Sequence, residues 1–257
     1  MPPSKSAPPH VTRLSTSDAT SITVRGRDLV NDLIGKVSYT EMMFFLIQER
    51  MPTPAEARVL DACMVTLMEH GLNASTIIAR LLDDSGPGQV QVAMAGGLLA
   101  VGDVFIGTMD GAARILIKGI QAQDAETFCR ETVADHIARK AALPGFGHRK
   151  HKPDDPRPAR LFEVAQEAGV DGRYIALLKL LSVEFDRAMG RHMTINATGA
   201  IAALLLEIGM PLEIMRAVAV VARAGGLPGH IVEGRRTRSG RRIWELVEQA
   251  VPYEPPA

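Results

Sequence analysis

The stretch LPGFGHRKHKPDDPR, residues 143–157, concentrates imidazole and positive charge on a segment that Gly and Pro keep from forming regular structure. It holds His148 and His151, and it ends on Arg157. Three further cations lie between the first His and the acid pair: Arg149, Lys150 and Lys152. Its glycines allow backbone N–H groups to approach a ligand, and its cations suit phosphate or carboxylate. Two interpretations are open from these residues: a solvated surface turn, or a pocket for an anionic substrate.

Polar residues also gather at four other places where helices are expected to break, and each has a structural interpretation beside the functional one. His70 lies at a predicted helix end, where imidazole often only interacts with the helix dipole. Asp110, between small residues in GTMDG, could serve only as an N-cap. The other two groups supply His192, Asn196 and Thr198, and Arg223, His230, Arg235 and Arg236. For most arginines of the tail, a solvated charged run is the simpler interpretation.

The composition indicates a globular protein built mainly from helices. The chain has 257 residues, enough for one large domain or two small ones with a real core. Hydrophobic residues make up 46% but aromatic residues only 4%, and this aliphatic balance favours helices over a β-sandwich. Lys plus Arg and Asp plus Glu each number 29, so the net charge of zero gives no indication of nucleic-acid or membrane-surface binding.

The cysteines and the apolar runs indicate in which cellular compartment the protein is expected. Cys63 and Cys129 show neither CxxC nor metal-ligand spacing, which is typical of reduced thiols in a cytoplasmic protein. The His and Asp residues also lack ligand spacing, so no metal is expected. The N-terminal residues contain no apolar signal segment, and Gly and Asp interrupt the longest apolar runs, so no membrane-spanning helix is expected.

The pattern of apolar residues predicts an all-α fold of about ten helices with no strand. Ser38 followed by Glu41 is a capping box before an apolar run. Pro54 follows Thr53 at the first position of a helix predicted to end by residue 71. The next helix is expected to be capped by Asn73 or Ser75, and the segment PLEIMRAVAVVARAGG predicts a helix from Pro to Gly-Gly.

Residues 1–20, rich in Pro, Ser and Thr, are expected to form a flexible N-terminal arm. Gly-rich stretches bracket the centre of the chain, which predicts a smaller inserted domain over 113–215. The larger domain would then combine residues 21–112 and 216–257. Glycines at such boundaries are also what hinge closure needs.

Four segments resemble the motifs of the citrate synthase superfamily, and they follow one another along the chain in the family's order. PGFGHRKHKPDDPR resembles its Gly-x-Gly-His, followed nine residues later by the Arg of Asp-Pro-Arg. HGLNAST, NATGAIAALLLEIGMP and ARAGGLPGHIVE resemble its His-Glu-Leu-Asn-Ala-Ser-Thr, Asn-x-Asp and Arg-x-x-Gly segments. GGLLAVGDVFIGTMDGAARIL is similar to the short citryl-CoA lyase branch, including the lyase module of ATP-citrate lyase. The resemblance extends from about residue 20 to residue 255.

This resemblance implies a citrate synthase-like all-α homodimer or higher homo-oligomer whose two domains bind coenzyme A and a small di- or tricarboxylate between them. No covalently bound cofactor is implied, and the coenzyme A thioester is the substrate. His148 would hold the oxaloacetate-side carbonyl or hydroxyl, and His70, Arg157 and Arg223 would bind carboxylates. Arg235 or Arg236 would be the Arg that a second subunit contributes. The coenzyme A contacts would come from Gly145, Phe146, Gly147, Arg149, Lys150 and Lys152.

Two positions depart from the family's pattern at the reacting end. Asp110 stands where synthases have the His that polarises the thioester carbonyl, and Thr198 stands where the family has its catalytic Asp. A threonine hydroxyl cannot take a proton at neutral pH, so Asp110 or His192 would have to substitute. The expected function is retro-Claisen cleavage of citryl-CoA to acetyl-CoA and oxaloacetate. The alternatives are a related acyl-CoA lyase or synthase with another substrate, and a non-catalytic protein that binds coenzyme A or a carboxylate.

Overall fold

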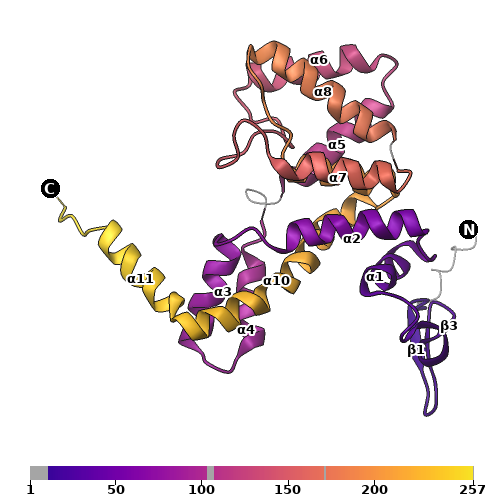
Figure 1. The fold of residues 1–257 in the computed structure, drawn as a ribbon, viewed down its shortest axis with the longest axis vertical. Helices are drawn as coiled ribbons and strands as arrows, with labels where there is room; N and C mark the ends of the chain where they lie inside the picture. Colours follow the sequence, from indigo (N-terminus) through magenta and orange to yellow (C-terminus); the bar gives the residue numbers. More distant parts are fainter. Residues whose placement is uncertain (1–10, 103–106, 171, 257) are drawn as a thin grey trace, which may run out of the picture. The chain divides into compact units, whose positions relative to one another are not determined.

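A computed structural model describes residues 11–102, 107–170 and 172–256, and helices dominate it, which confirms the all-α prediction (Figure 1). The helices of the N-terminal third are η1 Leu29–Leu33, α1 Tyr39–Gln48, α2 Pro54–Met68, α3 Ala74–Ser85 and α4 Val90–Leu99. Those of the rest are α5 Thr108–Ile120, α6 Ala125–Ala138, α7 Pro156–Glu167, α8 Arg173–Met189, α9 Ala197–Glu207, η2 Leu212–Ile214, α10 Met215–Thr237 and α11 Ser239–Ala250. None of the described helices is long and apolar enough to cross a membrane.

The prediction of no strand is wrong for a small antiparallel sheet near the N-terminus. Its strands β1 Ser15–Ser17, β2 Ile22–Val24 and β3 Arg27–Asp28 lie in the order β1-β2-β3. Arg25 and Gly26 both have positive φ, as a two-residue hairpin turn between β2 and β3 requires. The strands are two or three residues long, too short for an alternating pattern to show in the sequence. Residues 15–17, which the sequence assigned to a loose arm, are therefore paired.

The chain divides into two compact units, residues 1–57 and 58–257. In the first unit, Val24, Leu33 and Phe45 form a buried cluster. The predicted capping box begins α1: the Ser38 hydroxyl accepts from the Glu41 N–H, and the Glu41 carboxylate accepts from the Ser38 N–H. The division into domains at residues 112 and 215 stays a prediction.

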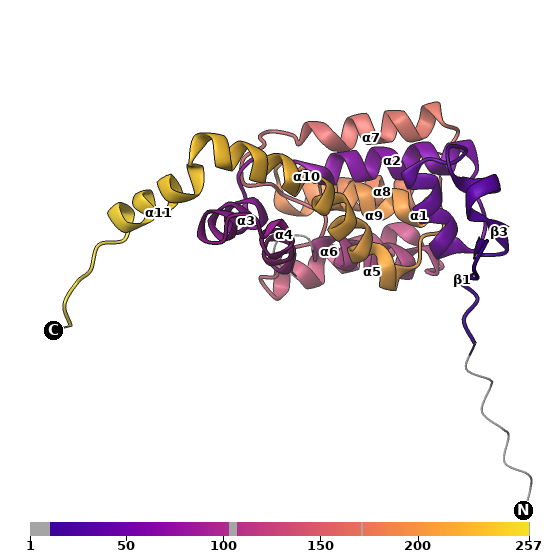
Figure 2. The same cartoon turned by 90° about the horizontal axis from the view of Figure 1, so that it is seen from below.

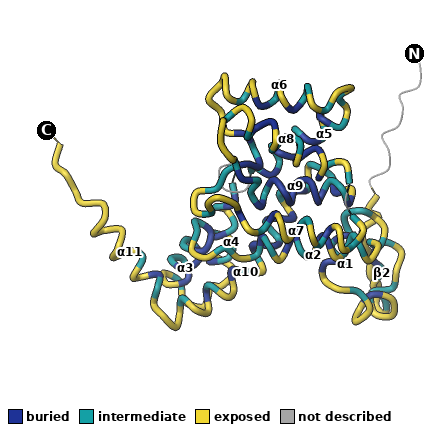
Figure 3. The backbone as a smooth tube through the Cα atoms, turned by 45° about the horizontal axis from the view of Figure 1, so that its top comes forward, coloured by how far each residue is buried: buried dark blue, intermediate teal, exposed yellow. Residues whose placement is uncertain are grey.

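Within the second unit, α9 is the central helix of one group of packed helices. It contacts α5, α7 and α8, and α6 packs on α8. Eight residues of α9 are buried, and Figure 3 shows this helix as mostly dark blue among its neighbours. Ala and Gly supply much of its surface, so the helices around it approach closely. The N-terminus of α9 is thereby held firmly where the basic loop meets it.

A second group contains α3, α4, α10 and α11, and Figure 2 shows α10 running past α3 and α4 into α11. A Cβ at Gly97 would lie 2.8 Å from the Ser75 carbonyl oxygen, so this glycine allows α3 and α4 to touch. The predicted helix end at Gly225 and Gly226 is wrong, since α10 continues to Thr237. A Cβ at Gly226 would lie 2.3 Å from the Met68 carbonyl oxygen. These glycines serve close packing rather than termination.

Candidate active site

The basic loop is fastened to the start of α9 by backbone contacts. Gly147 donates its N–H to the Thr194 carbonyl at 2.8 Å, and Asn196 donates its N–H to the Gly145 carbonyl at 3.0 Å. Gly145 and Gly147 have φ of 89° and 75°, a left-handed conformation that favours glycine. The Asn196 side chain donates to the Gly147 carbonyl and also caps α9. The Gly-x-Gly pattern thus fixes the position of the residue that follows, His148.

Gly199 in α9 leaves the room that this contact needs, because its Cβ would lie 2.4 Å from the Gly145 carbonyl oxygen. Gly199→Ala is expected to lower the free energy of unfolding by about 1–3 kcal/mol, the usual cost of overpacking. Urea denaturation measures this loss. Gly229→Ala in α10 is the matched control, since nothing lies within 4 Å of its Cβ and a helical Gly→Ala change then stabilises. Equal stability of wild type and Gly199→Ala would contradict the tight loop contact.

Asp155, a buried carboxylate at the N-cap of α7, orients Arg157. The Arg157 Nε and Nη2 atoms donate to the two Asp155 oxygens at 2.9 Å and 2.7 Å, and Ala197 of α9 donates its N–H to the same carboxylate at 3.2 Å. Burial acts to raise the pKa of Asp155, but the hydrogen bonds from Arg157 and the Ala197 N–H outweigh it and lower the pKa. The Nη1 atom of Arg157 has no hydrogen-bond partner in the part of the chain that the structure describes.

His148 is held as a neutral hydrogen-bond donor. Its Nδ1 accepts from the backbone N–H groups of Lys150 at 3.1 Å and His151 at 3.0 Å. A ring that accepts at Nδ1 carries its proton on Nε2. Burial lowers the pKa of His148 below 6.5, and the charges of His151, Arg157 and His70 lower it further against the effect of Asp155. The ring therefore offers an N–H at neutral pH without carrying a full charge.

His70 joins this group from the end of α2. Its Nε2 lies 3.2 Å from the Nε2 of His151, and its ring centroid lies 5.5 Å from that of His148. Burial lowers the pKa of His70, and the nearby charges of Arg157 and His151 act in the same direction. Three imidazoles and a guanidinium from distant segments of the chain thus lie close together.

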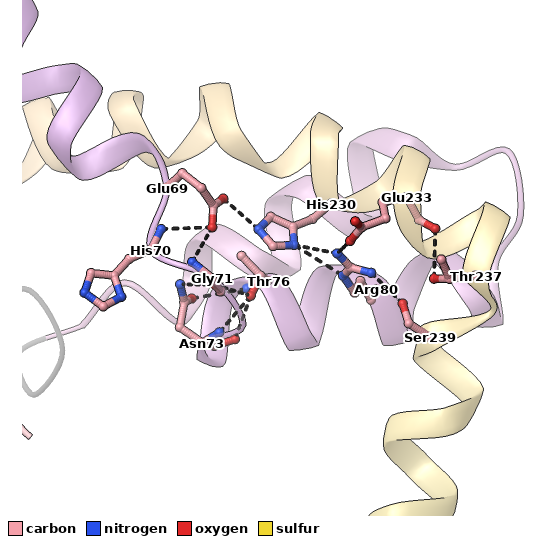
Figure 4. A network of polar contacts seen from close by, with 10 residues as sticks. All are labelled: Glu69, His70, Gly71, Asn73, Thr76, Arg80, His230, Glu233, Thr237 and Ser239. Carbon is pink, nitrogen blue, oxygen red and sulfur yellow. Dashed lines mark hydrogen bonds and ion pairs between the residues drawn. The ribbon is translucent and has the colours of Figure 1, made fainter. Parts of the chain in front are cut away.

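A directed chain of hydrogen bonds supports the His70 backbone (Figure 4). Arg80 can only donate, and its Nη2 lies 2.8 Å from the Nδ1 of His230, which must therefore accept. The other ring nitrogen of His230 donates to Glu69 at 2.7 Å. The second Glu69 oxygen accepts from the N–H groups of His70 and Gly71. Arg80, buried on α3, thus fixes the turn that presents His70.

Glu69→Ala is expected to lower the free energy of unfolding by about 1.5–3 kcal/mol, the usual contribution of a hydrogen bond to a charged group. The loss arises in the turn between α2 and α3, where the N–H groups of His70 and Gly71 lose their acceptor. Urea denaturation measures it, and Glu163→Ala on the exposed face of α7 is the control. Equal stability of wild type and Glu69→Ala would contradict this role.

Arg223 of α10 is a buried cation with an unused donor. It is 7% exposed, and its Nη1 has no hydrogen-bond partner among the described residues. Burial lowers the pKa of the guanidinium, and the charge of Glu69 opposes that effect. A buried polar atom without a partner is costly unless a ligand supplies one. A carboxylate oxygen is one of the groups that accept a hydrogen bond from a guanidinium.

The sequence matches the family described as citrate synthase, C-terminal domain, over residues 39–244, which is most of its length. The chain belongs to the citrate synthase family. A putative citrate synthase 2 of Mycobacterium tuberculosis is 28% identical over 207 residues, which cover 79% of this chain and 54% of that protein. The citrate synthase of a Synechocystis strain is 26% identical over 201 residues, covering 76% and 49%. The chain therefore spans about half the length of these curated relatives.

Two solved structures resemble this citrate synthase family member, one over most of its own length and the other over less than half of it. The citryl-CoA lyase of Hydrogenobacter thermophilus is 28% identical with a TM-score of 0.79, and the match covers 87% of this chain and 86% of that one. The ATP citrate lyase of Methanothrix soehngenii, solved with citrate and coenzyme A, has a TM-score of 0.82 over 98% of this chain and 42% of its own. At 19% identity this second likeness shows the fold alone.

Thr198 and Asp110, the two residues that depart from the citrate synthase family pattern, both form hydrogen bonds with other side chains. The Thr198 hydroxyl lies 2.8 Å from that of Thr108 and donates to Asn196 Oδ1 at 2.7 Å. Asp110 binds the Arg216 guanidinium through Oδ2, at 2.8 Å from Nη2, while its buried Oδ1 has no partner among the described residues. His192, the other possible substitute, bridges Asp186 and Asp154 and is exposed, and these carboxylates raise its pKa.

The residues predicted to bind coenzyme A or to serve a second subunit differ in their exposure and in the partners they already have. Arg149, Lys150 and Lys152 are exposed, as coenzyme A phosphates would need, but the Phe146 side chain is buried and lies edge-on against Phe185. Any adenine contact at Phe146 would thus fall to the backbone. The Nε and Nη2 atoms of Arg235 donate to the two carboxylate oxygens of Asp83, at 2.8 Å and 2.7 Å. Arg236 is exposed and forms no ion pair with the described side chains.

Sequence reasoning missed several residues that hold the site. Glu69 and His230 are 161 residues apart, and Thr194 and Asp155 are 39 apart, so neither pairing shows as local spacing. His151 and His230 were noted among the polar residues of the sequence but given no role. The signal that could have identified Glu69 is the family's His-Glu pattern: here the position after His70 is Gly71, and an acid precedes the His instead.

Proposed function

We propose that this chain is a citryl-CoA lyase-like enzyme that cleaves citryl-CoA, or a similar 3-hydroxy-3-carboxyacyl-CoA, to an acyl-CoA and a 2-oxo acid. The observation that carries the proposal is the neutral His148 ring, whose Nδ1 is held by two backbone N–H groups so that Nε2–H is the donor. The match to citryl-CoA lyase over nearly the full length of both chains supports the lyase over the longer synthases.

At the oxo-acid end, His148 donates to the oxygen that becomes the ketone. Arg157 and Arg223 bind carboxylates, because one offers its Nη1 end and the other a buried donor without a partner. His70 contributes a further contact to the same anion. A cationic wall of this kind favours a substrate that carries carboxylates on the carbon that bears the hydroxyl.

Cleavage breaks the bond between the carbinol carbon and the carbon next to the thioester. The hydroxyl gives its proton to solvent, and its oxygen becomes the carbonyl of the oxo acid. The bonding electrons pass to the acyl-CoA as an enolate, whose carbon takes a proton from solvent, so the reaction releases no net proton. The His148 N–H stabilises the negative charge that develops on the oxygen, and this is the role its tautomer favours over that of proton acceptor.

At the coenzyme A end, Arg149, Lys150 and Lys152 bind phosphates, and the backbone of Gly145, Phe146 and Gly147 contacts the adenine. The chain acts as a homodimer in which Arg236 of one copy completes the site of the other. Arg235 is the weaker choice for this role, because Asp83 already occupies its guanidinium.

An acyl-CoA panel tests the proposal against its two rivals. Citryl-CoA, and separately acetyl-CoA with oxaloacetate, are incubated with the chain, and both the free thiol and the 2-oxo acid are measured. The lyase yields a 2-oxo acid from citryl-CoA with no free thiol. Turnover only of another hydroxyacyl-CoA would indicate a related lyase or synthase. A raised melting temperature with coenzyme A and no turnover would indicate a binding protein.

A further inference from the structure

Three His side chains from distant parts of the chain present nitrogen atoms to one another. His70, His148 and His151 each offer a ring nitrogen, and these atoms all lie within 4.8 Å. The Nε2 atoms of His70 and His151 are 3.2 Å apart, although the residues are separated by 81 positions. Nitrogens bound to one tetrahedral Zn²⁺ at 2.0–2.1 Å lie about 3.3 Å apart. Two of the three are therefore already spaced as neighbouring metal ligands.

His151 has no part in the proposed cleavage. Its ring stacks on His148 with a centroid distance of 4.3 Å and meets His70 edge-on at 5.4 Å. Its side chain forms a hydrogen bond with His70 among the described residues, and the whole cluster is only partly buried. A metal ion can therefore reach it from solvent, and three imidazoles are a ligand set that suits zinc, copper and nickel.

We propose that His70, His148 and His151 bind a divalent first-row transition metal ion, foremost Zn²⁺, and that this ion excludes the oxo acid. Three protein ligands leave the fourth tetrahedral position to water. Coordination through the Nε2 atom of His148 moves the ring proton to Nδ1, so the ring gives up its hydrogen bonds from Lys150 and His151. The metal-bound His148 then no longer donates to a substrate oxygen. Metal and substrate therefore exclude each other. The metal site itself is independent of the proposed function, whereas the exclusion of the oxo acid rests on it.

Titration of the full chain, freed of metal with a chelator, tests the site. Co²⁺ is added first, because its visible absorption reports tetrahedral coordination, and Zn²⁺ affinity follows by calorimetry. Wild type is expected to bind one ion, and His151→Asn to bind it at least about tenfold more weakly. His136→Asn in α6 is the matched control, since among the described residues this His bonds only to the Thr132 carbonyl. His70→Asn is the second variant, and thermal melting verifies that each chain is folded.

Equal affinity in wild type and His151→Asn, or no binding by wild type, would overturn the metal site. Oxaloacetate is then added to the Co²⁺ form. Loss of the tetrahedral absorption is expected, and an unchanged spectrum would overturn the exclusion of the oxo acid by the metal. The Co²⁺ spectrum needs no turnover, so failure of the lyase assay and failure of the metal site remain distinguishable.

Discussion

Replacing His148 with alanine is expected to slow cleavage of citryl-CoA by about 10²–10³-fold, the usual cost of removing a preorganised donor at a developing oxyanion. The ring lies in a loop that Gly145 and Gly147 fasten to α9, so its N–H is already in position when substrate arrives. The loss is expected in kcat more than in KM, because the charge on the oxygen develops only in the transition state.

Steady-state rates of oxo-acid release measure this effect. His192→Ala, which removes an exposed imidazole paired with Asp186 and Asp154, is the control and should retain the wild-type rate. A kcat of His148→Ala within a few-fold of wild type would contradict the assigned role.

The same His148 predicts the pH dependence of the rate. Its pKa is lowered, chiefly by burial, so the neutral donor persists below pH 6.5, where an ordinary His becomes protonated. The rate is expected to stay constant as pH falls through 6.5 and to decline only at lower pH. A half-maximal rate at or above pH 6.5, in a chain that melts normally, would contradict the neutral donor.

Restoring the family's acid at Thr198 is expected to raise the cleavage rate by about 10²–10⁴-fold, the usual contribution of a positioned acid–base group. Thr198 lies in the first turn of α9, close to its N-cap Asn196. The Thr108 hydroxyl, now 2.8 Å from that of Thr198, would donate to the new side chain. An aspartate there could give a proton to the enolate carbon, which threonine cannot.

Thr198→Asn separates acid–base chemistry from simple filling of space, since its amide has nearly the shape of Asp but cannot hold a transferable proton. Rates of both variants are measured with citryl-CoA under the same conditions. The expected result is a gain for Thr198→Asp alone. Equal rates for the two variants, or no gain with Asp, would show that another group already supplies this proton.

The sequence predicts local features of the fold well, because they depend on neighbouring residues. The capping box at Ser38, the proline start of α2 and the Asn73 cap of α3 are all confirmed. The prediction that this helix ends at Gly225 and Gly226 was wrong, because these glycines allow α10 to pack against Met68 of α2. The small sheet was missed because strands of two or three residues are held by pairing rather than by an apolar pattern.

For the site, too, motif spacing predicts some residues, whereas the contacts between distant parts of the chain could not be predicted. The loop glycines, His148 and Arg157 were singled out by motif spacing, and contacts in the fold place His70 beside them. The arrangement that gives them a chemical role could not be predicted. The Nδ1 contacts that set the His148 tautomer come from backbone atoms, and the support of the His70 turn comes from Arg80 on another helix.

Release of oxaloacetate from citryl-CoA by the wild-type chain tests the central claim most directly. The expected result is continuous release, matched by acetyl-CoA, that disappears in His148→Ala. No release from wild type, while coenzyme A and oxaloacetate still raise its melting temperature, would contradict the lyase account and indicate a family member that binds these ligands without cleaving citryl-CoA.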